Sequence, residues 1–391
     1  MLLLEDNKPT LPSAIFFNAE DNATYYGRAA LANYLAGHEG RLMRSLKSLL
    51  GTNLIDGQTE VDGRALPFRD LLTQFIAELK RRAEKSAGKQ FTKAVLGRPV
   101  HFVDDNSNAD RIAENTLADI AYSVGFTDIT FQFEPIAAAF DYESQIQREE
   151  LVLIADIGGG TSDFSLVRLS PTRAKKLDRH DDILANGGVH IGGTDFDKYL
   201  SLASVMPLMG LGSKLISNAD VPSSYYFNLA TWHTINLAYT QKTWLQLKEV
   251  VRDAQERDKL GYLLNLIEDR AGHWLAMTVE EGKIALSDHT HTQLDLTCLR
   301  PHRTLSLNRT TFNEAIAHLM DKIEGTVSNL LRDADVAADD VHTIFFTGGS
   351  SGVHLLREKI AALVPRAQRI EGDLFGSIGA GLALDAMRKF G

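Results

Sequence analysis

The chain has 391 residues, 44% hydrophobic and 24% charged, which excludes a disordered or collagen-like protein and leaves room for two or three domains or one fold of two similar lobes. Its net charge of −10 argues against an overall basic surface for nucleic acid or an anionic membrane, and no apolar run approaches the ~20 residues of a membrane span. The single cysteine, Cys298, excludes an intrachain disulfide and a four-cysteine zinc site, and it favours a reducing cytosol.

The predicted elements alternate between short apolar strands and longer amphipathic helices, which indicates an α/β protein. In the first half, helices are expected over 68–87, 109–124 and 136–142, and strands over 94–96 and 129–133. The centre predicts a hairpin, with strands over 151–155 and 164–169 and glycines at its tip. Residues 200–277 are expected to be mostly helical, with a looser stretch over 210–224. The last third predicts helices over 311–333, up to 363 and from 377, with a strand over 343–346.

Three glycine turns at strand ends are candidate anion-binding sites, because their backbone N–H groups can approach a phosphate where a side chain would block it. The turns are Gly158-Gly159-Gly160-Thr161, Gly192-Gly193-Thr194 and Gly348-Gly349-Ser350. Asp156 and Asp163 flank the first turn, where a carboxylate can hold hydrated Mg²⁺ and Thr161 can bond a phosphate oxygen or position water. An ordinary hairpin is the alternative for the glycines alone. The turn leads into a strand and lacks the P-loop and dinucleotide-binding patterns, so it belongs to another kind of fold.

Two further groups of residues have both a structural and a functional interpretation. Glu134 precedes a proline that suits a helix start, so the helix N-terminus either simply stabilises this carboxylate or holds it where it orients a catalytic water. Lys47 either faces solvent or neutralises a phosphate. Glu280, Lys283 and Ser287 share one helical face, which forms either a surface ion pair or a polar face that bonds a ribose or base. Cys298 has no neighbouring base in the sequence and is expected to be an inert thiol.

Five motifs in this order resemble the ATPase domain of the 70-kDa heat-shock chaperones (DnaK type), and most closely the short bacterial YegD-type members. They are Phe133-Glu-Pro-Ile-Ala-Ala-Ala139, Asp156-Ile-Gly-Gly-Gly-Thr-Ser-Asp163, His190-Ile-Gly-Gly-Thr-Asp-Phe-Asp197, Glu280 to Ser287, and Phe346-Thr-Gly-Gly-Ser-Ser351. The resemblance covers nearly the whole chain. It implies an actin-like (ribonuclease H-like) fold with a first lobe over 1–148, a second lobe over 149–391 with a helical subdomain over about 194–305, and Mg-ATP or Mg-ADP in a cleft between the lobes.

The resemblance also implies roles for single residues. Asp156 is the carboxylate near Mg²⁺, Gly158, Gly159, Gly160 and Thr161 form the phosphate turn, and Asp163 is a water or ion ligand. Lys47 matches the lysine that contacts the γ-phosphate, Glu134 the catalytic glutamate, and Pro135 the proline that senses nucleotide state. Gly192 and Gly193 approach the phosphates. The adenosine is held by Glu280, Lys283 and Ser287 on one side and by Gly348, Gly349, Ser350 and Asp373 on the other.

The sequence departs from the family pattern in three places. Ile284 and Gly352 stand where the long chaperones carry adenine-stacking arginines, which predicts weaker base stacking. Residues 1–17 resemble the family segment that follows a first Asp-x-Gly-Thr hairpin, so that hairpin is expected upstream of Met1, and Asp56-Gly-Gln-Thr59 is not expected to replace it. No interdomain linker or peptide-binding domain is expected after Gly391.

The sequence therefore predicts a cytosolic, chaperone-like protein that binds Mg-nucleotide, and that hydrolyses ATP if the native protein carries the missing turn. Two alternatives stay open: a non-catalytic actin-fold scaffold with an unidentified protein partner, and a small-molecule kinase of the same fold. The Glu134-Pro135 segment and the Glu280 face argue against the kinase. The expected partners are a nucleotide and, for the scaffold, a protein, with no nucleic acid or membrane.

Overall fold

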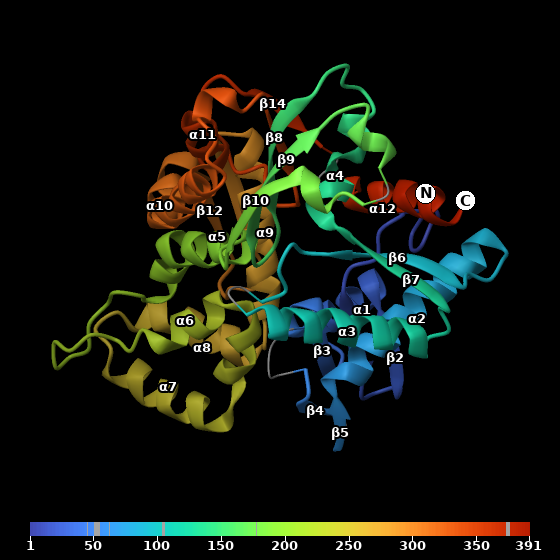
Figure 1. Ribbon diagram of the computed structural model, residues 1–391. Helices are drawn as coiled ribbons and strands as arrows, with labels where there is room; N and C mark the ends of the chain where they lie inside the picture. The colour runs from blue at the N-terminus through green and yellow to red at the C-terminus, as the bar shows by residue number, and fades with distance from the viewer. Residues whose placement is uncertain (45, 51–54, 62, 104–105, 177, 373–375) are drawn as a thin grey trace. The chain divides into compact units, whose positions relative to one another are not determined.

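The computed structural model describes residues 1–391 except 45, 51–54, 62, 104–105, 177 and 373–375. The chain divides into two compact units (Figure 1). Unit 1 comprises Met1–Glu150, Val167–Ile183 and Gly372–Gly391, and unit 2 comprises Leu151–Leu166 and Leu184–Glu371. The chain is mixed α/β, as predicted.

The described residues of unit 1 form short strands and five α-helices. An antiparallel sheet has the order β2-β1-β3, with β1 (Ala14–Asn18), β2 (Ala23–Tyr26) and β3 (Gly40–Arg44). Two-stranded sheets are formed by β4 (Gln58–Val61) with β5 (Arg64–Pro67), and by β6 (Lys93–Arg98) with β7 (Asp128–Phe133). The α-helices are α1 (Gly27–Leu35), α2 (Phe68–Ala87), α3 (Ser107–Ser123), α4 (Glu134–Glu143) and α12 (Ser377–Phe390), with a 3₁₀ turn η1 (Leu46–Leu49).

The helices of unit 1 follow the predicted hydrophobic periodicity. Helix α2 begins at Phe68 and ends at Ala87 as expected, because Leu71, Leu72 and Phe75 form its buried stripe and Gly88 adopts a left-handed C-cap at φ 66°. The strands before Phe68 were not predicted, although β1 is a buried apolar run, because each of them has only four or five residues, too few to establish a period.

The main sheet of unit 2 has five strands in the order β10-β9-β8-β13-β14. The strands are β8 (Glu150–Ile157), β9 (Ser162–Leu169), β10 (Ile183–Val189), β13 (Thr343–Thr347) and β14 (Gln368–Glu371). Strand β13 lies parallel to β8 on one side and to β14 on the other. The β8–β9 hairpin is the one that the sequence predicts, and buried Val152, Leu153, Ile154 and Ala155 explain its continuous apolar run.

The helices of unit 2 occupy most of the region predicted to be helical. They are α5 (Gly193–Leu200), α6 (Ser224–Ala230), α7 (Gln241–Asp253), α8 (Arg257–Glu268), α9 (Gly272–Asp288), α10 (Arg309–Asp333) and α11 (His354–Leu363). Shorter turns are η2 (Arg173–Lys175) and η3 (His180–Asp182) in unit 1, and η4 (Ser201–Val205), η5 (Met206–Met209), η6 (Trp232–Tyr239) and η7 (Ala338–Asp340) in unit 2. A hairpin of β11 (His291–Leu296) and β12 (Arg303–Asn308) was not predicted.

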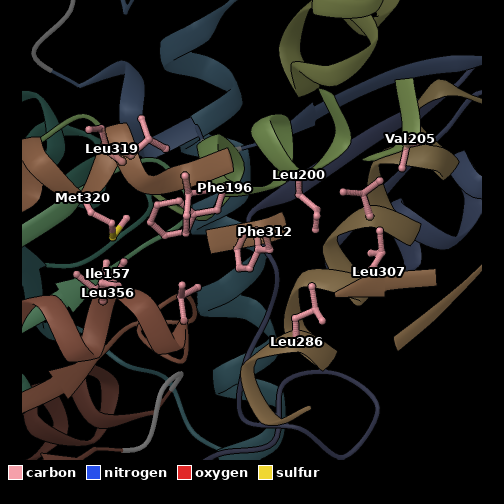
Figure 2. Close-up of a cluster of buried hydrophobic side chains, with 14 of the residues drawn as sticks. Ile157, Phe196, Leu200, Val205, Leu286, Leu307, Phe312, Leu319, Met320 and Leu356 are labelled. Atoms are coloured by element: carbon pink, nitrogen blue, oxygen red, sulfur yellow. The ribbon is translucent and has the colours of Figure 1, made fainter. Parts of the chain in front are cut away.

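The core of unit 2 joins the sheet to its helices. Ile157 from β8, Phe196 from α5 and Phe312 from α10 belong to one buried cluster, and Figure 2 shows these side chains with Met320 and Leu356. Burying large side chains of this kind stabilises the folded state by about 1.5–3 kcal/mol each, so the cluster fixes the ends of β8 and the start of α5, where the glycine turns lie. No helix among the described residues is long and apolar enough to cross a lipid bilayer.

Candidate functional site

The first predicted turn lies at the tip of the β8–β9 hairpin. The Gly158 N–H donates a hydrogen bond to the Thr161 carbonyl at 2.9 Å, and the Thr161 hydroxyl donates to the Asp163 carboxylate at 2.8 Å. Gly159 and Gly160 are exposed, and a Cβ built on either would meet no atom within 4 Å. Neither has a positive φ among the described glycines, so the fold itself does not require glycine at these two positions.

The second predicted turn packs directly against the first. The N–H groups of Gly193 and Thr194 donate to the carbonyls of Gly158 and Gly159 at 3.0 and 2.7 Å, and the Thr194 hydroxyl also reaches Gly159 at 2.8 Å. A Cβ on Gly192 would lie 2.7 Å from backbone atoms of Gly159 and Gly160. Glycine at 192 is therefore required by packing, and the Gly193 amide, predicted to approach a phosphate, is bonded to the first turn.

The third predicted turn joins the same group, because β13 lies parallel to β8 and pairs Thr347 with Asp156. Gly348 has a φ of 83°, and a Cβ there would lie 2.4 Å from an Asp156 carboxylate oxygen. The Ser350 N–H donates to the Ile157 carbonyl at 2.9 Å. The carboxylate of Asp156 and the tip at Gly159 thus lie in one cluster of three glycine turns within unit 2.

The predicted polar face of 280–287 lies on helix α9, as expected. Lys283 is buried, and its ammonium group pairs with Asp197 at 2.9 Å and donates to the Gly193 carbonyl at 3.3 Å. Its ion pair is therefore buried and supports the second turn, whereas the surface alternative predicted an exposed pair. Glu280 is half-buried, and a Cβ on Gly352 would lie 3.5 Å from the Ser287 hydroxyl.

Lys47 and Glu134 come together in unit 1, although 87 positions separate them in the sequence. Lys47 lies on η1 and Glu134 is the first residue of α4, followed by Pro135, and their side chains form an ion pair and a hydrogen bond. The lysine side chain is 46% exposed and the glutamate side chain 20% exposed. The pair therefore remains open to solvent while the helix N-terminus favours the carboxylate.

Asp156 and Asp163 are the predicted metal ligands, and the prediction is for magnesium. The described residues contain no group of three or more His, Cys, Asp or Glu side chains that could hold a metal ion. Magnesium is commonly held by one or two carboxylates together with water and phosphate oxygens, so Asp156 and Asp163 meet this lower requirement. The predicted adenosine contact Asp373 lies outside the described residues.

Two residues of the cluster had no predicted role of their own. Asp197 forms the ion pair with Lys283. The Thr194 hydroxyl links the first two turns, because it donates a hydrogen bond to the Gly159 carbonyl. The only sequence signal for Asp197 is its place in the His190 to Asp197 motif, since pairing with a residue 86 positions away leaves no local pattern.

Burial raises the pKa of the Cys298 thiol to about 12, which agrees with the expected inert thiol. A pocket of about 160 Å³ in unit 1, beside Phe133 and His180, contains none of the predicted site residues.

A family model described as Hsp70 protein matches residues 52–205 and 250–385. The chain is 24% identical over 411 aligned residues to the Chaperone protein HscA homolog of Pasteurella multocida (strain Pm70), covering 99% of this chain and 54% of the relative. It is 23% identical to the Chaperone protein DnaK of Mycoplasmopsis synoviae (strain 53), covering 86% of this chain and 47% of the relative. The chain thus spans about half the length of these curated relatives.

Proposed function

Because the chain belongs to the Hsp70 protein family, we propose that it is a chaperone-like protein of the actin-like ATPase fold that binds Mg-ATP or Mg-ADP through the glycine turns of unit 2. The observation that carries the proposal is the contrast among the glycines. Gly192 and Gly348 are required by close packing, whereas Gly159 and Gly160 have open space where a side chain would be. A phosphate approaching the backbone supplies the missing reason for glycine there.

The neighbouring residues support the same proposal. Thr161 and Asp163 are hydrogen-bonded to each other at the tip, and Asp156 stands beside Gly348 at the end of β8. We assign Asp156 and Asp163 to Mg²⁺, which neutralises phosphate charge when it is bound, and Thr161 to a phosphate oxygen or a water. Lys283 is assigned to positioning the Gly193 turn through its buried bonds to Asp197 and the Gly193 carbonyl.

Exchange of Gly159 for alanine tests the phosphate site directly. We expect Gly159→Ala to weaken Mg-ADP binding at least about tenfold, because a methyl group would displace the phosphate, and to leave the free energy of unfolding within about 0.5 kcal/mol. Calorimetric titration and urea denaturation measure the two quantities. Gly325→Ala is the matched control, since Gly325 lies on α10 and a Cβ there also meets nothing within 4 Å. Equal Mg-ADP affinity of wild type and Gly159→Ala would contradict the assignment.

For hydrolysis, we propose that Glu134 orients or deprotonates the attacking water and that Lys47 neutralises the terminal phosphate. The exposed ion pair of these two residues supports the assignment, because an accessible carboxylate and ammonium remain available to a substrate. We expect Glu134→Gln to abolish any Mg-ATP turnover while Mg-ADP binding persists. Turnover that survives this exchange would exclude Glu134 as the catalytic group.

A further inference from the structure

Helix α9, which carries the polar face predicted over 280–287, ends at Asp288 and is held there by an arginine from the next helix. The Nε and Nη2 groups of Arg309 donate hydrogen bonds to the carbonyls of Leu286 and Ser287 at 2.8 and 3.1 Å. The last carbonyls of an α-helix have no partner within the helix, and a positive charge at this end also interacts favourably with the helix dipole. Arg309 therefore fixes the turn of α9 that contains Ser287.

The backbone that carries Arg309 is itself held in place. The Arg309 N–H donates to the Thr290 carbonyl at 2.9 Å, and the side chain of the preceding Asn308 caps α10 by accepting from the Thr311 N–H at 2.8 Å. A guanidinium group is planar, so two acceptors bonded to it are kept in one geometry. Both of its bonds to α9 use backbone carbonyls, and neither occupies the Ser287 hydroxyl.

A second arginine holds the segment that faces Ser287. A Cβ on Gly352 would lie 3.5 Å from the Ser287 hydroxyl oxygen, so the chain just after the third glycine turn meets the end of α9. The Nε group of Arg357 donates to the Ser351 carbonyl at 2.6 Å, and its guanidinium lies 5.6 Å from the centroid of the Phe346 ring. Phe346 is buried in β13. Arg357 therefore ties the residue before Gly352 to the strand that leads into the turn.

We propose that Arg309 and Arg357 are positioning residues for the nucleoside part of the bound nucleotide. Arg309 sets the place of Ser287 and Arg357 sets the place of Gly352, on the two sides of one contact. This inference rests on the proposed function, because it concerns the same site. Each arginine acts through a backbone carbonyl, so neither has to touch the nucleotide. The hydrogen bonds between the first two glycine turns involve neither arginine, so the phosphate contacts of those turns do not depend on them.

Calorimetric titration with Mg-ADP and with Mg-pyrophosphate separates the nucleoside part of the affinity from the phosphate part, because pyrophosphate has no ribose or base. We expect Arg309→Ala to bind Mg-ADP at least about tenfold more weakly and to bind Mg-pyrophosphate within about twofold of wild type. The ratio of the two affinities also separates positioning from stability. Partial unfolding would lower the apparent affinity for both ligands by the same factor and would leave their ratio unchanged.

Three further variants complete the test. Arg357→Ala is expected to weaken Mg-ADP binding at least about threefold, again without changing pyrophosphate binding. If Arg309→Ala does not fold, Arg309→Lys replaces it, since it keeps the charge beside the end of α9 but not the planar fork, and the same threefold loss is expected. Arg303→Ala is the matched control with the wild-type ratio, because Arg303 lies on β12 and donates to the Tyr262 hydroxyl at 2.7 Å.

The outcomes distinguish this inference from the proposed function. Wild-type protein that binds neither ligand would disprove the proposed function, and the positioning roles with it. Wild-type protein that binds Mg-ADP no more tightly than Mg-pyrophosphate would overturn the positioning roles alone, since the nucleoside would then contribute nothing. A preference for Mg-ADP that the variants of Arg309 and Arg357 retain, or that Arg303→Ala loses equally, would also overturn them and leave the two arginines with a structural role.

Discussion

Two predicted site lysines, one in each unit, form ion pairs with carboxylates, and the two pairs differ in burial. Lys283 and Asp197 have side chains only 6% and 17% exposed, whereas Lys47 and Glu134 are 46% and 20% exposed. A buried charge depends on its partner, because removing the partner leaves an uncompensated ion away from water. An exposed pair gains little from pairing, so its charges are available to a ligand at small cost in stability. The first pair therefore supports the turns, and the second leaves its charges accessible, as the proposed roles of Lys47 and Glu134 require.

The largest effect is expected from removing one partner of the buried pair. Asp197→Ala should lower the free energy of unfolding by about 3–5 kcal/mol, because the ammonium of Lys283 would stay buried without its carboxylate. Urea denaturation measures the loss. Asp220→Ala, which removes the exposed partner of Lys214, is the matched control and should cost less than about 1 kcal/mol. Similar losses in the two variants would remove the distinction between buried and exposed pairs.

An intermediate effect is expected at Asp110, which accepts hydrogen bonds from Arg98 and from the Phe102 N–H in unit 1. Burial raises the pKa of Asp110, but the hydrogen bonds from Arg98 and Phe102 together lower it by more. The pKa of Asp110 therefore lies below the usual value of 3.8. A lowered folded-state pKa stabilises the fold above pH 3.8, and this contribution is lost as the pH falls through the folded-state pKa.

Asp110→Asn should therefore be less stable than wild type by about 1–3 kcal/mol at neutral pH, and the difference should shrink below pH 3.8. Urea denaturation at a series of pH values gives both curves. Parallel curves down to the lowest pH at which the protein folds would exclude this linkage.

The smallest effect is expected at the exposed pair. Lys47→Ala should change the free energy of unfolding by less than about 1 kcal/mol, because solvent screens the attraction between Lys47 and Glu134. A loss above about 2 kcal/mol would mean that the pair is structural, and the proposed division of roles would then fail.

Much of the fold could be predicted because its elements carry local patterns. The stripe of Leu71, Leu72 and Phe75 with Gly88 after it gave the bounds of α2, and the apolar run of β8 before three glycines gave the central hairpin. The β11–β12 hairpin and the strands before Phe68 were not predicted, although β11 alternates between exposed and buried residues; the strands before Phe68 have only four or five residues each. Most of these strands pair with the next strand along the chain, and packing against the rest of the fold, more than an intrinsic backbone preference, decides whether such short segments become strands.

The residue types of the candidate site can be read from the sequence alone: three glycine turns, two flanking aspartates, and the segments around Lys47, Glu134 and Lys283. Which of these residues lie in contact depends on the folded chain. It gathered the three turns around the end of β8, paired Lys283 with Asp197, and brought Glu134 to Lys47. It also separated the glycines that packing requires from Gly159 and Gly160. A glycine motif in the sequence indicates only that a side chain is excluded at that position. Whether neighbouring backbone or a bound ligand excludes it depends on which atoms face the glycine in the folded chain.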